Sequence, residues 1–187
     1  MFLRKIAKIS NEKNGNIVGR IGGNIPQVLL ERSGDLDGYN FYISFQNPDD
    51  RHEHISIFVP NDYDEMLKGN IYPDCTVKVF SHSISTESDS DSYTLRSISK
   101  SFIVGYEVVS QDETDFITFS EYPNLIQDEE YYFKDLKRDG YSFFAQVDED
   151  YYPDSLNVEN YIFGYGALYL YKNLTTGNII AGFWQFS

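Results

Sequence analysis

Short runs of β-branched and aromatic residues recur along this chain, and clusters of Gly, Pro, Asn, Asp and Ser separate them. Such runs predict strands, because these side chains pack well on a pleated, half-buried surface. The clearest pair, 41–46 and 54–59, is separated by the turn residues 47–50 and is predicted to form a hairpin. A longer hairpin is predicted where 173–178 joins the last two runs. The remaining predicted strands are 75–82, 93–98, 102–109, 116–119, 141–147, 165–171 and 179–186.

A short helix is predicted over residues 63–67. Asn61 or Asp62 can cap its N-terminus with a side-chain oxygen, and Gly69 provides the stop. Residues 83–92 form a different kind of segment, since they are almost all Ser, Thr, Asp and Glu. We expect this segment to be a mobile surface loop.

A second helix is predicted over residues 128–137. Acidic residues in its first turn, basic residues toward its end and a stop at Gly140 all agree with the helix dipole. Tyr132 and Leu136 are four positions apart, so they share one face of this helix. We therefore expect these two side chains to pack in the core.

Together these elements predict an α+β fold, made mainly of antiparallel β-sheet with one or two short helices. A chain of 187 residues is long enough for one stable core, so we expect a single domain over 1–187. Two related half-sheets, over about 1–110 and 111–187, are the alternative arrangement. Trp184 is the only tryptophan and lies in the last predicted strand, which indicates that this strand is paired inside a sheet.

The negative charge of the chain is concentrated in one stretch. The formal net charge is −14, and residues 111–159 alone hold fourteen Asp and Glu against three Lys and Arg. Such a field attracts cationic partners and repels phosphate backbones. We therefore expect a basic protein partner and no nucleic acid. The alternative is that the charge only keeps a tyrosine-rich domain soluble.

The candidate binding surface is an arc of carboxylates and tyrosines within this stretch. Tyrosine supplies a large contact area at a small entropic cost, and carboxylates steer and bind Lys or Arg. The ten predicted partner-binding residues are Asp128, Glu129, Glu130, Tyr131, Asp148, Glu149, Asp150, Tyr151, Tyr152 and Asp154.

The sequence signals for metal binding are weak. His52 and His54 are two apart, so a strand would point both imidazoles to one face, but only His82 remains as a third histidine. The acidic run 148–159 has carboxylates at several positions of a calcium loop, yet Pro153 stands where such a loop needs glycine. We expect no metal and no cofactor.

No catalytic motif predicts an enzyme either. The sequence contains no serine-nucleophile elbow, no phosphate-binding glycine loop and no dinucleotide fingerprint. Cys75 and His82 are predicted at opposite ends and faces of one strand, which does not suit a catalytic pair.

A single cysteine forms no internal disulfide, and the sequence shows neither a signal peptide nor a long apolar segment, so we expect a cytosolic protein without membrane contact.

Five short motifs follow one another along the chain. They are Gly22-Gly23 with Pro26, Tyr122-Pro123 with Ile126-Gln127, Phe143-Phe144-Ala145-Gln146-Val147-Asp148, Tyr165-Gly166-Ala167-Leu168-Tyr169-Leu170-Tyr171 and Trp184-Gln185-Phe186-Ser187. Their order resembles that of the YwqG-like family of uncharacterised bacterial proteins, from about residue 20 onward. The chain departs from the family pattern after the first motif, where residues 27–30 replace the usual Leu-Pro and Trp-Pro pairs.

The resemblance implies a mixed fold dominated by antiparallel sheet in two related halves, and no established reaction. Proteins similar to this family are found among candidate immunity proteins, which bind and block a bacterial toxin. We therefore expect a cytosolic immunity protein that neutralises a cognate, basic toxin domain. The alternative is a small-molecule or carbohydrate-binding protein that uses Trp184 and the tyrosines as stacking faces.

Overall fold

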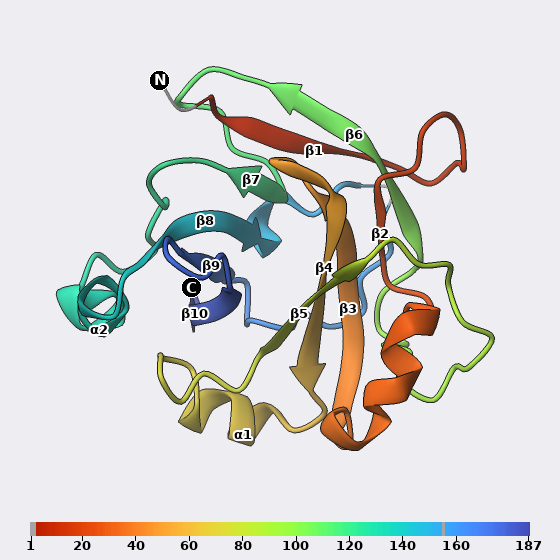
Figure 1. Cartoon of the computed structure of the whole chain (residues 1–187), viewed down its shortest axis with the longest axis horizontal. Helices are drawn as coiled ribbons and strands as arrows, with labels where there is room; N and C mark the ends of the chain where they lie inside the picture. Colours follow the sequence, from red (N-terminus) through yellow and green to blue (C-terminus); the bar gives the residue numbers. More distant parts are fainter. Residues whose placement is uncertain (1–2, 155) are drawn as a thin grey trace.

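The computed structural model describes residues 3–154 and 156–187. Within them, strands pair as one antiparallel sheet in the order β10-β9-β8-β7-β1-β6-β2-β3-β4-β5 (Figure 1). This confirms the predicted α+β fold with mainly antiparallel sheet. The strands are β1 Lys5–Ser10, β2 Gly19–Ile21, β3 Tyr39–Asn47, β4 Asp50–Pro60, β5 Lys78–Ser83, β6 Ser101–Val108, β7 Ile117–Phe119, β8 Tyr141–Asp148, β9 Ala167–Asn173 and β10 Ile179–Gln185.

The sheet curls until its two outermost strands, β5 and β10, contact each other. Ile71, which precedes β5, forms an isolated bridge with Phe183 of β10 at this junction. The main hydrophobic core fills the concave side, with fully buried residues such as Ile43, Ile103 and Leu168. The predicted half-domain boundary at residue 110 falls between β6 and β7, and β1 joins the two groups of strands by pairing with both.

Two smaller apolar layers cover the outside of the sheet. On one side, Tyr171 and Phe183 of β9 and β10 pack with Leu136. On the other side, Phe41 of β3 packs with Leu29. Leu29 belongs to the helix η1 and Leu136 to the helix α2. The helices are η1 Gln27–Asp35, α1 Tyr63–Lys68, η2 Glu130–Tyr132, α2 Lys134–Arg138 and η3 Glu149–Tyr151.

The first predicted helix is confirmed as α1. The carboxylate of Asp62 caps it by accepting hydrogen bonds from the backbone N–H groups of Asp64 and Glu65, at 2.9 and 3.4 Å. Gly69 is its C-cap residue. Local capping chemistry was therefore a sufficient signal for this element.

The second predicted helix, over 128–137, is too long. The chain forms one 3-10 turn, η2, and then the separate helix α2, because Phe133 between them leaves the helical conformation with φ −122°. Tyr132 donates a hydrogen bond from its hydroxyl to Gln127, and the backbone N–H of Gln127 donates to the side chain of Gln185, so this segment is tied to the end of β10. The prediction that Tyr132 and Leu136 pack in the core is confirmed.

One other expectation is wrong. Residues 93–98 form no strand and make only isolated bridges, Thr94 with Phe41 and Ile98 with Val158. In the segment 83–92, the Glu87 carboxylate accepts a hydrogen bond from the Asn24 backbone N–H at 2.8 Å, and the mobility of this segment stays a prediction. None of the helices in the described part of the chain has the length and apolar character that a bilayer-spanning segment needs.

Candidate functional site

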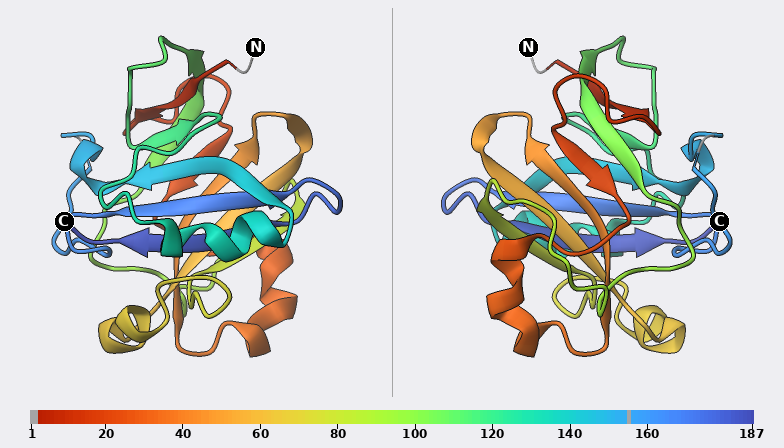
Figure 2. Two further views of the ribbon diagram at one scale, coloured as in Figure 1. Left: turned by 90° about the vertical axis from the view of Figure 1, so that its left-hand side faces the viewer. Right: turned by 90° about the vertical axis from the view of Figure 1, so that its right-hand side faces the viewer.

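The fold brings the two acidic runs of the sequence to the same end of three neighbouring strands. The last residue of β8, Asp148, pairs with Ala167 at the start of β9, and Ala167 pairs with Gln185 at the end of β10. The side-chain carbonyl of Gln185 accepts a hydrogen bond from the backbone N–H of Gln127 at 3.1 Å. Residues 128–131 therefore begin beside the end of β10, on the same side of the molecule as the end of β8 (Figure 2).

Exposed aromatic side chains gather at this end together with the carboxylates. Tyr165 is 58% exposed and stacks on Tyr161, with ring centroids 4.0 Å apart. Tyr165 also has a positive φ of 61°, which is strained for a bulky residue. We call this area the strand-end surface; its exposed members are Glu129, Glu130, Tyr131, Asp150, Tyr151, Asp154, Tyr165 and Phe186.

The ten predicted partner-binding residues divide into two groups. Six of them are members of the strand-end surface as defined above. Of the other four, Asp128 is exposed, Tyr152 is partly exposed, and Asp148 and Glu149 are buried. The last two carboxylates point into the protein, so they are not accessible to a partner in this conformation.

Glu149 is the anchor of the long segment between β8 and β9. Glu149 is only 1% exposed, and its carboxylate accepts hydrogen bonds from four donors. Three are backbone N–H groups, from Ile162 at 2.6 Å, Phe163 at 3.0 Å and Gly166 at 3.4 Å. The fourth is the hydroxyl of Tyr152 at 3.1 Å. One buried side chain thus fixes the loop that carries Tyr165.

Burial decides the protonation of Glu149. Removal of the carboxylate from water raises its pKa to about 7, although the four hydrogen bonds favour the charged form. The Tyr152 hydroxyl lies 2.6 Å from the hydroxyl of Tyr42, which extends the chain of polar groups into the core. Burial also raises the pKa of Asp148.

Strand period does not predict the inward position of Glu149. Residues 144–148 of β8 are all buried, so alternation does not separate Asp148 from Glu149. The contacts that hold Glu149 inside come from residues 162–166, later in the chain, and no local pattern specifies them.

A serine and a histidine from neighbouring strands, which no sequence motif links, are in contact. The Ser56 hydroxyl lies 2.7 Å from Nε2 of His82, and Nδ1 of His82 lies 2.7 Å from the carbonyl of Ser83. Since a carbonyl can only accept, Nδ1 carries the proton, and the Ser56 hydroxyl has a second partner in the hydroxyl of Ser44 at 3.0 Å. This is the arrangement of a nucleophile and its base. Ser56 is fully buried, however, so a substrate cannot reach its oxygen in this conformation.

Burial raises the pKa of the Cys75 thiol to about 12, which leaves no thiolate for catalysis at neutral pH.

His52 is exposed and His54 is buried, so the two imidazoles do not form a common surface site. Within residues 3–154 and 156–187, no three His, Cys, Asp or Glu side chains lie close enough together to hold a metal ion.

We expect His54 to make the protein sensitive to acid. Burial, and then the neighbouring His82, lower the pKa of His54, so the unfolded chain takes up a proton first as the pH falls. The stabilisation from neutral His54 is therefore complete above about pH 6.5 and is lost below it. Urea unfolding of the wild type and His54→Phe from pH 7.5 to 5 should show the wild type losing more stability. If the free energy of unfolding changed equally with pH in the two proteins, His54 would not be the source of the acid sensitivity.

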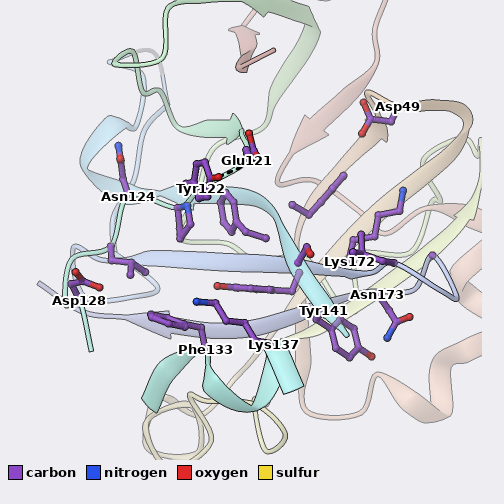
Figure 3. Close-up of a pocket in the computed structure, with 18 residues that line it drawn as sticks. Asp49, Glu121, Tyr122, Asn124, Asp128, Phe133, Lys137, Tyr141, Lys172 and Asn173 are labelled. Carbon is purple, nitrogen blue, oxygen red and sulfur yellow. Dashed lines mark hydrogen bonds between the residues drawn. The ribbon is translucent and has the colours of Figure 1, made fainter. Parts of the chain in front are cut away.

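A groove of about 1100 Å³ runs beside β8 (Figure 3). Figure 3 shows Asp128 toward one end, and Lys172 with Asp49 toward the other. Lys137 of α2 also lines it. Six of its 18 lining residues are aromatic: Tyr122, Phe133, Tyr141, Phe143, Phe144 and Tyr171. A groove of this size and composition is typical of a ligand-binding site.

Comparison of the chain with protein-family models, with curated proteins and with solved structures found no significant match. The likeness to the YwqG-like family therefore stays a prediction from the motifs alone.

Proposed function

We propose that this protein binds a basic protein partner through its strand-end surface. The observation that supports the proposal is the convergence of two acidic runs, about twenty residues apart in sequence, around exposed aromatic side chains. Tyr131, Tyr151 and Tyr165 are all more than 40% exposed, at 55%, 44% and 58%. Exposed aromatics in one area are unusual unless they serve an interface.

The chemistry of the surface fits a partner rich in Lys and Arg. Tyrosines act as anchors because they bury a large area and lose little side-chain entropy. The surrounding carboxylates speed the encounter and form charge-assisted hydrogen bonds with ammonium and guanidinium groups. Affinity should therefore depend on both the rings and the charges, and should fall as salt screens the charges.

The concrete form of this proposal is neutralisation of a cognate bacterial toxin in the cytosol. The resemblance to the YwqG-like family suggests this role. A toxin that acts on nucleic acid has a cationic cleft, and a surface of carboxylates can occupy that cleft in place of phosphate. In this role the protein needs no catalytic group of its own.

A second candidate function is the binding of a small molecule, and the aromatic groove beside β8 favours it. The expected stacking role of Trp184 is wrong, since this side chain is fully buried. A ligand would instead meet rings such as Tyr122, which is 72% exposed and lines the groove.

Charge reversal on the strand-end surface should abolish tight partner binding. In the double variant Glu129→Lys, Glu130→Lys, two attractive charges become repulsive, and we expect the affinity to fall at least tenfold. The partner is sought by co-expression with the neighbouring open reading frame, and its affinity is measured at low and high salt. If the partner is a toxin, protection of growing cells provides a second readout.

The matched control is Glu31→Lys, Asp37→Lys, which makes the same charge change at two exposed positions outside the strand-end surface. It should bind almost as the wild type does. Equal losses in both double variants would mean that only net charge matters, and binding that is indifferent to salt and to both variants would refute the proposal.

A further inference from the structure

Strand β8 has a free edge along its first half. Residues 141–143 pair with β9 on one side, as Tyr141 with Asn173, Ser142 with Lys172 and Phe143 with Tyr171. On the other side, β7 pairs only with residues 145–147. Among the residues that the structure describes, 141–144 thus have no ladder partner on the β7 side. An unpaired edge of this kind is a template for an added strand.

The groove lies along this free edge and reaches both faces of the sheet. Phe143 and Tyr171 belong to the apolar layer on the outer face of the sheet, whereas Phe144 belongs to the main core on the inner face. All three residues line the groove. Side chains of an added strand would alternate between these two faces and would meet aromatic rings on each.

Each face also offers one lysine. On the outer face, Nζ of Lys137 lies 4.2 Å from the ring centroid of Phe133. On the inner face, Nζ of Lys172 lies 5.9 Å from the ring centroid of Phe144. Neither ammonium group forms an ion pair with any described carboxylate. The groove lining also contains three carboxylates, Asp49, Glu121 and Asp128, so a carboxylate on the ligand is complementary only directly beside a lysine.

We propose that the groove binds an extended peptide segment, which adds to the free edge of β8 as an eleventh strand. Its side chains alternate between the two faces, with apolar residues against the aromatic walls and an acidic residue beside Lys172. The peptide backbone supplies the ladder hydrogen bonds that residues 141–144 do not make within the chain. This site is separate from the strand-end surface, and it does not depend on a basic partner.

The test uses a displayed library of random ten-residue peptides, selected against the full chain. Enriched sequences should alternate apolar residues and should contain Asp or Glu. One synthetic, fluorescently labelled peptide from the selection is then N-methylated on its backbone, at odd or at even positions. Because alternate N–H groups of a strand face its neighbour, one set of methyl groups should weaken binding at least tenfold and the other set should have little effect.

Two lysine variants test the position of the peptide. Lys172→Glu should weaken binding of an acidic peptide at least tenfold, and Lys134→Glu is the matched control, an exposed lysine that does not line the groove. Amide hydrogen exchange of residues 141–144 should slow when the peptide binds. Equal effects of the two methylation sets, equal losses in the two variants, or selection of no binding peptide would each overturn the proposal.

Discussion

Replacing Glu149 by alanine is expected to lower the free energy of unfolding by about 3–5 kcal/mol at pH 5, because it leaves buried donors without an acceptor. Three backbone N–H groups and the Tyr152 hydroxyl lose their partner at once. Denaturant unfolding measures the loss directly. Hydrogen exchange should show the segment that leads to Tyr165 opening first.

The control is Asp150→Ala at the adjacent, exposed carboxylate, which should change the stability by less than about 0.5 kcal/mol. The pH dependence provides a second readout. With a folded pKa near 7 and an ordinary value of 4.5, Glu149 holds its proton longer in the folded state. Its contribution to stability therefore falls as the pH rises from 4.5 to 7, by up to about 3 kcal/mol. A difference between wild type and Glu149→Ala that grows with pH would contradict this account.

Replacing Trp184 by alanine is expected to cost about 3–5 kcal/mol, since it removes the largest fully buried side chain and leaves a cavity. The indole packs against Phe163 and Tyr63, with ring centroids 5.6 and 6.0 Å away. Deletion of residues 179–187 would remove all of β10 and should prevent folding. Thermal unfolding and near-ultraviolet circular dichroism measure both effects.

Phe186→Ala provides the matched comparison, because this aromatic residue is two positions away but 44% exposed. Its loss should cost less than about 1 kcal/mol. If both substitutions had the same small effect, the last strand would not be an integral part of the sheet in solution.

Most of the sheet could be predicted from the sequence, because its strands are long enough to show their composition. The β3–β4 hairpin, β8 and the β9–β10 hairpin lie where the apolar runs and turn residues place them. β1 and β2 were not predicted. β1 contains two lysines within six residues, and β2 has only three residues, so neither provides a clear local pattern. Long-range pairing forms these strands.

The candidate site was only partly predictable for a related reason. Composition identified the acidic runs, but which carboxylates are exposed depends on the path of the following loop and on its long-range contacts. Glu149 is buried against the later segment 162–166, whereas its neighbour Asp150 is exposed. The groove depends on where β7 ends relative to β8, and no local sequence pattern specifies that register.

The central position of β1 has a consequence for how the protein folds. β1 is made early in the chain, yet its neighbours in the sheet are β6 and β7, which follow about a hundred residues later. Its ladder cannot form until a long loop has closed, and closing such loops is slow because the entropy is lost before the contacts form. We expect the local hairpins β3–β4 and β9–β10 to form first, and insertion of β1 between β6 and β7 to be a late step.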